Sequence, residues 1–169
     1  MKKIGFMGVY DKTDLVIYIA KMLTSFGKKV IVVDATNIQK AKYVIPAINP
    51  TTTYVTEFED IDIAVGFRKP ELINEYLGFE TEQELPYDYM LVDSDNLETI
   101  QNFNLPKAEK KYFVTSFDLY SLKKGLEILR RNKRTNNINK NTILKRHVGG
   151  RRWLFKLFIF RLQNNMEWF

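Results

Sequence analysis

The sequence predicts an α/β protein with a doubly wound, mostly parallel sheet and helices on both faces. Short apolar runs alternate with segments of helical spacing along residues 1–130, and this order of strand and helix is typical of βαβ units. Several runs are β-branched without polar alternation, as expected of strands covered on both faces. The length of 169 residues suits one domain of ordinary size.

The predicted elements follow one another in the order β-α-β-β-α-β-α-β-α. We expect strands at residues 3–10, 30–33, 87–92 and 111–115, with one or two more within 45–67. We expect helices at residues 14–26, 70–76, 97–103 and 120–131. Gly27 and Gly78 stand where two of these helices should end, and Pro70 stands at a first helical turn.

Charge divides the chain at residue 122. Residues 1–122 carry 13 Lys+Arg against 18 Asp+Glu, whereas residues 123–169 carry 13 against 2, so the net charges are −5 and +11. Without cysteine the chain has no disulfide or thiolate metal site, and the cytoplasm is the expected compartment. The apolar run after Met1 is interrupted by Asp11 and Lys12 too early for a signal peptide.

Candidate functional residues stand where the predicted strands end. Gly8, Lys12 and Thr13 lie between a strand and a helix, where backbone N–H groups and a helix N-terminus can meet phosphate. Asp34 and Asp93 each close an apolar strand. Because ligands of open parallel sheets bind at the carboxyl ends of the strands, these carboxylates are candidate Mg²⁺ ligands.

The same residues also have a purely structural interpretation. Lys12 would then be a surface lysine, with Asp11 or Thr13 as the cap of the following helix. Asp34 and Asp93 would cap the turns that follow their strands. The sequence leaves both interpretations open.

The phosphate-loop pattern is incomplete at two positions. A working loop needs glycine directly before the lysine and six residues before it, because the backbone must curl around the phosphate. Asp11 and Phe6 occupy these positions. Asp11 also places a negative charge beside the phosphate site, at a cost on the order of 1 kcal/mol or more. We therefore expect weak binding of a triphosphate or none.

On these residues, the segment 1–130 resembles the ParA/MinD family of deviant P-loop ATPases, which includes the TadZ-like localisation proteins. Gly8, Lys12 and Thr13 match the family's phosphate loop, Asp34 matches the aspartate closing the second strand, and Asp93 matches the Walker B aspartate. The resemblance implies a Rossmann-like P-loop NTPase fold, with ATP and Mg²⁺ as cofactors.

The resemblance also assigns roles to the matching residues. By resemblance, Lys12 would contact the terminal phosphates, and Thr13 would ligate Mg²⁺. Asp34 would be the catalytic residue that orients water, while Asp93 would hold the metal shell.

Three departures from the family pattern indicate a degenerate ATPase. The lysine that reaches across the dimer in the family is Met7 here. The second acid expected after Asp34 is Thr36. The family fold also continues further, so we expect either a relative with a shortened C-terminal part or an abnormal end of the reading frame.

Residues 131–169 are expected to form a basic tail outside the α/β domain. Its first part, through Arg146, is interpreted as a linker, and residues 151–162 are aromatic-rich and basic. Drawn as a helix, this second part suits an anionic membrane surface, which four of its residues would contact. These are Arg152, Trp153, Phe155 and Lys156. The alternative is a buried strand or helix that completes the core, with its basic side chains reaching outward.

Two functions of different class follow. The preferred one is a non-hydrolysing localisation or scaffold factor, which holds a protein partner of an assembly or secretion machine at the inner membrane face. The alternative is an active ATPase switch that dimerises with ATP. A weaker alternative is DNA association through the thirteen positive charges of residues 123–169, although the aromatic density of the tail favours lipid.

Overall fold

The computed structural model describes residues 1–46, 52–80, 84–136, 143–146 and 158–162. Its strands are β1 (Lys2–Met7), β2 (Val30–Asp34), β3 (Tyr54–Phe58), β4 (Ile61–Val65), β5 (Tyr89–Ser94), β6 (Lys110–Thr115), β7 (Ile143–Arg146) and β8 (Phe158–Leu162). Its helices are α1 (Thr13–Ser25), α2 (Ala41–Val44), α3 (Pro70–Tyr76), α4 (Leu97–Asn102) and α5 (Leu119–Asn136), with a 3₁₀ turn at Leu105–Lys107.

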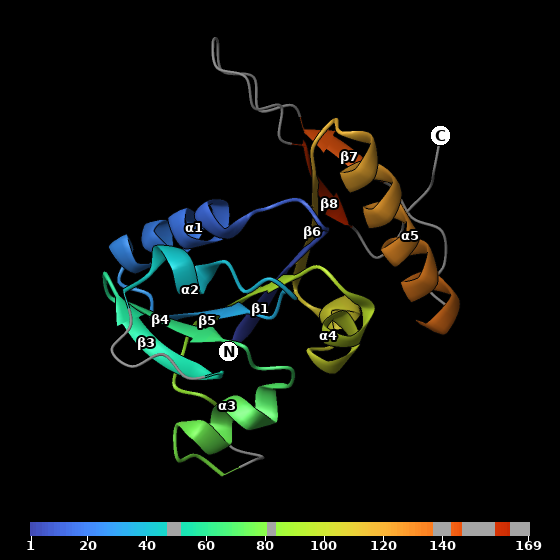
Figure 1. Cartoon of the computed structure of the whole chain (residues 1–169). Coiled ribbons are helices and arrows are strands. Elements are labelled where there is room, and N and C mark those ends of the chain that lie inside the picture. The colour runs from blue at the N-terminus through green and yellow to red at the C-terminus, as the bar shows by residue number, and fades with distance from the viewer. Residues whose placement is uncertain (47–51, 81–83, 137–142, 147–157, 163–169) are drawn as a thin grey trace.

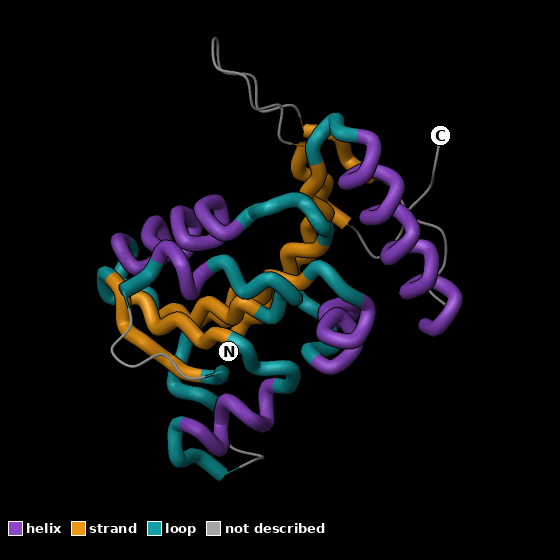
Figure 2. The backbone as a smooth tube through the Cα atoms, viewed as in Figure 1, coloured by secondary structure: helices purple, strands orange, loops and turns teal. Residues whose placement is uncertain are grey.

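The strands form one mostly parallel sheet. Within the described residues its order is β3-β4-β2-β5-β1-β6-β8-β7, and Figure 2 shows the strands running together through the middle of the molecule. The five strands from β4 to β6 in this order are parallel. Strand β3 pairs antiparallel with β4, and β8 pairs antiparallel with both β6 and β7. The predicted fold class is confirmed.

Helices cover both faces of this sheet (Figure 1). One face packs against α1 and α2, through residues such as Val16 and Ala41. The opposite face packs against α3, α4 and α5, through Ile73, Ile100 and Ile128. Alternate side chains of each central strand enter the two cores, which explains why β2 is buried along its whole length.

Two helices end just before the glycines at which the sequence predicted their ends. Gly27 has φ +72° and Gly78 has φ +76°, the left-handed conformation that closes a helix without cost only for glycine. Gly27 N–H donates to Thr24 O at 2.8 Å, and Gly78 N–H donates to Glu75 O at 3.1 Å. These predicted helix ends are confirmed.

The chain after residue 130 differs from the expected linker. Helix α5 continues to Asn136, and Ile143–Arg146 is strand β7, so the linker interpretation is wrong for these segments. The local sequence is polar and basic, but β7 finds a backbone partner in β8. Such pairing is long-range and leaves little trace in local periodicity.

Part of the expected amphipathic helix is a strand. Phe158–Leu162 forms β8, which adds to the sheet beside β6 with Phe113 opposite Phe160. The helical interpretation of this part is therefore wrong, and Phe158–Leu162 has the strand conformation that the alternative named. Pairing with β8 satisfies the backbone groups along an edge of β6 that would otherwise be open.

The four predicted membrane contacts lie outside the described residues. These are Arg152, Trp153, Phe155 and Lys156. In the part of the chain that the structure describes, no helix has the length and apolar character needed to cross a membrane.

Candidate functional site

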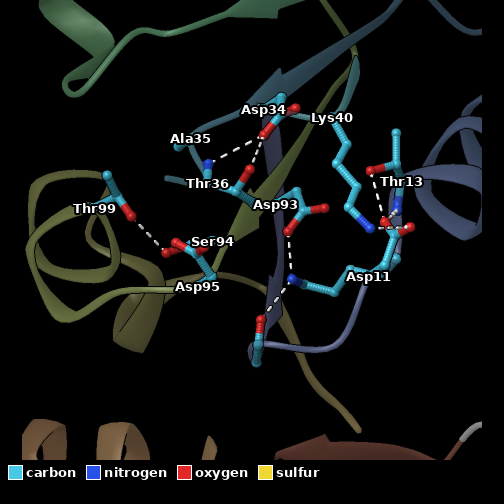
Figure 3. Close-up of polar contacts among 12 residues, drawn as sticks. Asp11, Thr13, Asp34, Ala35, Thr36, Lys40, Asp93, Ser94, Asp95 and Thr99 are labelled. Carbon is cyan, nitrogen blue, oxygen red and sulfur yellow. Dashed lines mark hydrogen bonds and ion pairs between the residues drawn. The ribbon is translucent and has the colours of Figure 1, made fainter. Parts of the chain in front are cut away.

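The structure brings the predicted site residues together at the carboxyl edge of the sheet. Asp34 on β2 and Phe6 on β1 lie in register with Asp93 on the strand between them, β5. The loop of residues 8–13 leaves β1 at this edge and leads into α1. Figure 3 shows Asp34, Asp93 and Asp11 at this edge, with Asp34 in contact with its own following segment and Asp11 beside Lys40 and Thr13. Gly8, Lys12 and Thr13 therefore share one site with the two aspartates.

Position 8 requires glycine because the backbone of β6 passes very close to it. Its φ is +131°, and a Cβ at this position would lie 2.2 Å from the carbonyl oxygen of Val114 on β6. Its N–H donates to Ser94 O at 3.1 Å. The start of the loop is thus fixed to the strand ends on both sides of β1.

Lys12 is buried rather than exposed. Its Nζ lies 2.5 Å from Asp93 Oδ1, and the two side chains are 1% and 5% exposed. The same ammonium donates to the carbonyl oxygen of Gly8 at 2.8 Å. Burial raises the pKa of Asp93, and the positive charge of Lys12 opposes this shift. The interpretation of Lys12 as a surface lysine is therefore wrong.

The carboxylate of Asp11 accepts hydrogen bonds from Thr13, the first residue of α1. Its Oδ1 accepts hydrogen bonds from the Thr13 N–H at 3.2 Å and from the Thr13 hydroxyl at 3.0 Å. Its Oδ2 forms an ion pair of 2.8 Å with Lys40 Nζ. Partial burial acts to raise the pKa of Asp11, but the hydrogen bonds from Lys40 and Thr13 outweigh it and lower that pKa.

Asp34 holds the segment that follows β2. Its Oδ1 accepts from the Thr36 N–H at 3.1 Å and from the Thr36 hydroxyl at 2.6 Å. Its Oδ2 accepts from the Ala41 N–H at 2.9 Å. Asp95 fixes the same segment through the Asn37 N–H, at 3.0 and 3.1 Å from its two oxygens. These contacts agree with the turn-capping interpretation of Asp34.

Lys40 is a site residue that sequence analysis missed. It precedes the four-residue helix α2, which was not predicted, and no periodicity marks the segment 35–40. Its contact with Asp11 spans 29 positions in sequence. Only a signal of long-range pairing would have revealed it.

Two of the substituted positions, Phe6 and Met7, belong to the core. Phe6 is 1% exposed, and its ring stacks on Tyr112 with centroids 5.4 Å apart. Met7 is 2% exposed and packs in the opposite core, on the side of α4 and α5. Neither side chain reaches the hollow between the loop and the strand ends.

The hollow at the site is small in this arrangement of the side chains. Its volume is about 60 Å³, whereas pockets for small molecules measure roughly 300–1,000 Å³. It is lined by Val9, Tyr10, Asp11, Lys12, Thr13, Thr36, Ile38, Lys40, Asp93 and Asp95. Both lysines of this lining carry a carboxylate partner.

The side chains in this arrangement also do not fit Mg²⁺. Asp93 is paired with Lys12, and the Thr13 hydroxyl donates to Asp11. Among the described residues, no three His, Cys, Asp or Glu side chains are placed to hold a metal ion together. A magnesium triphosphate would require these contacts to be exchanged for new ones.

Comparison with known proteins supports the fold. No family model matches the chain, and no curated protein matches it in sequence. A plasmid partition protein from Borrelia burgdorferi has a TM-score of 0.52 at 16% identity, covering 80% of this chain and 74% of its own. A putative plasmid partition protein from Borrelia burgdorferi B31, bound to AMPPNP, has a TM-score of 0.51 at 15% identity, covering 80% and 71%. The chain therefore has a ParA-like P-loop NTPase fold.

Proposed function

We propose that this protein is a degenerate relative of the ParA/MinD proteins that does not hydrolyse ATP and acts as a localisation or scaffold factor. The observation that carries the proposal is the buried ion pair between Lys12 and Asp93. In the resembling family these two positions serve the phosphates and the metal, whereas here each neutralises the other.

The surroundings of the pair support the same proposal. Asp34, the candidate catalytic residue, accepts three hydrogen bonds from its own chain and is 2% exposed. Thr13, the candidate metal ligand, donates its hydroxyl to Asp11. The side chains of Lys12, Thr13, Asp34 and Asp93 thus each have a partner within the chain.

The basic C-terminal region supports a role in localisation. Residues 123–169 carry 13 Lys+Arg against 2 Asp+Glu, and such a region is attracted to anionic lipid. Placed at the inner membrane face, the α/β domain would present a folded surface to a protein partner of an assembly or secretion machine. A homodimer is compatible with this role.

Calorimetric titration with Mg-ATP and Mg-ADP tests the proposal. We expect no binding heat up to millimolar ligand. Lys12→Ala and Thr13→Ala are the matched variants, with folding checked by circular dichroism, and Thr13→Ala serves if loss of the buried lysine unfolds the chain. Micromolar binding that either variant abolishes would overturn the proposal.

The competing function is an ATP-dependent dimerising switch. The structural neighbour bound to AMPPNP, an ATP analogue, favours it, as does the clustering of Gly8, Lys12 and Thr13 at one site. The same titration separates the two functions. Sedimentation of the protein without nucleotide, with Mg-ADP and with Mg-ATP would then show whether the dimer forms only with ATP.

The membrane part of the proposal has its own test. The full chain should co-sediment with vesicles of phosphatidylethanolamine and phosphatidylglycerol. The double variant Arg151→Glu with Lys156→Glu should lower the amount of co-sedimenting protein several-fold. A DNA duplex is the parallel arm, because a basic region also binds phosphates of nucleic acid. Loss of DNA binding with unchanged vesicle binding would show that the membrane assignment is wrong.

A further inference from the structure

We infer that Asp11 is a built-in anion that keeps this site closed to phosphate groups. This inference rests on the proposed function and names the residue that determines it. The carboxylate of Asp11 accepts from the N–H of Thr13, the first residue of α1, and a helix N-terminal N–H is the kind of donor that holds phosphate in nucleotide-binding loops. Figure 3 shows Asp11 between Thr13 and Lys40, with contacts to both.

The contacts of Asp11 are those expected of a bound anion. Three donors meet its two oxygens: the N–H and hydroxyl of Thr13 and the ammonium of Lys40, at 2.8 to 3.2 Å. A backbone N–H, a hydroxyl and an ammonium are also the donors that hold phosphate at helix N-termini. The chain therefore supplies from within the negative charge that its loop would otherwise take from a ligand.

The charges around the hollow explain why a second anion is excluded. Lys12 and Lys40 are the cations of its lining, paired with Asp93 and Asp11 respectively. Asp95 adds a further negative charge. An incoming phosphate would meet no unpaired cation among the lining residues, and it would be repelled by the carboxylates at close range.

Asp11 also joins two parts of the site. Its contact with Lys40 connects the loop 8–13 to the segment before α2. That segment is held independently, by Asp34 through Ala41 and by Asp95 through Asn37. Replacing the carboxylate of Asp11 by an amide should therefore release Lys40, while the amide oxygen can still accept from Thr13 and the segment stays in place.

The test compares Asp11→Asn with Asp14→Asn. Both variants remove one negative charge from the start of α1, and both positions are exposed, but Asp14 does not line the hollow. Calorimetry uses pyrophosphate, which probes the anion contacts alone, and Mg-ATP. We expect Asp11→Asn to bind pyrophosphate at least tenfold more tightly than the wild type, and Asp14→Asn to remain within twofold of it.

A double variant checks the route of the effect. Adding Lys40→Met to Asp11→Asn should remove most of the gain, because the released ammonium is the new phosphate partner. Equal pyrophosphate affinity of Asp11→Asn and Asp14→Asn, with no Mg-ATP binding to the wild type, would overturn this inference and leave the proposed function standing. Micromolar Mg-ATP binding to the wild type would overturn both.

Discussion

Lys12 and Asp93 lie 2.5 Å apart in an ion pair whose side chains are 1% and 5% exposed. Removing two charges from water is costly, and their attraction roughly offsets that cost only while both partners are present. The pair therefore contributes less to net stability than its short distance suggests. Its effect is to fix the loop after β1 against β5.

A double-mutant cycle on this pair should show strong coupling. Lys12→Met or Asp93→Leu alone should destabilise the protein by about 3–5 kcal/mol, because each leaves an unpaired buried charge. The double variant should cost much less than the sum of the two. Urea unfolding of the four proteins measures the cycle. Additive losses would show that the two side chains do not interact in solution.

Gly8→Ala should be far more disruptive than Gly27→Ala. At Gly8 an added Cβ would lie 2.2 Å from the Val114 carbonyl oxygen, whereas at Gly27 no atom of another described residue beyond its chain neighbours lies within 4 Å. Both glycines have positive φ, so both variants carry backbone strain. We expect a loss of about 1 kcal/mol at Gly27 and about 3 kcal/mol or more at Gly8. Thermal unfolding would contradict the structure if the losses were equal.

Asp118, before α5, should titrate at unusually low pH. Hydrogen bonds from the hydroxyl of Ser116 and from Ser121, whose N–H lies 2.7 Å from Oδ1, lower the pKa of Asp118 to about 2. Because this is below the unfolded value of about 3.9, its stabilising contribution is complete above pH 4 and is lost as pH falls toward 2.

Carboxyl chemical shifts followed by NMR measure this titration directly. Ser116→Ala should move the midpoint of Asp118 upward, toward the ordinary aspartate value, because one hydrogen bond to the ionised form is removed. Glu127, whose pKa is lowered by Lys124 and Arg131, should be unaffected and serves as the internal control. A wild-type midpoint near 4 would contradict the geometry at Asp118.

Apart from the short helix α2, the order of strands and α-helices along residues 1–130 followed from local patterns. The apolar run at residues 30–33 indicates a buried strand, and Gly27 or Gly78 ends a helix by its conformational freedom. Because each such signal depends on a few neighbouring residues, it can be read without knowing the fold. The clustering of Asp34 and Asp93 also followed, since parallel strands deliver their carboxyl ends to one edge.

The C-terminal strands did not follow from local patterns. Phe158–Leu162 has the basic and aromatic composition of an amphipathic segment, yet it pairs with Lys110–Thr115 of β6. Backbone pairing between segments more than 40 positions apart depends on which edge of the sheet is open. Composition alone carries no information about that edge.

The sequence by itself determined the fold class and the strand ends with the charged residues Lys12, Asp34 and Asp93, because periodicity and chain order fix them, but it did not reveal Lys40. Only the tertiary structure decided how those charges are paired. Lys12 reaches Asp93 and Lys40 reaches Asp11 because folding brings distant segments within hydrogen-bonding distance. A buried charge that finds a partner within the chain is stabilised without a ligand.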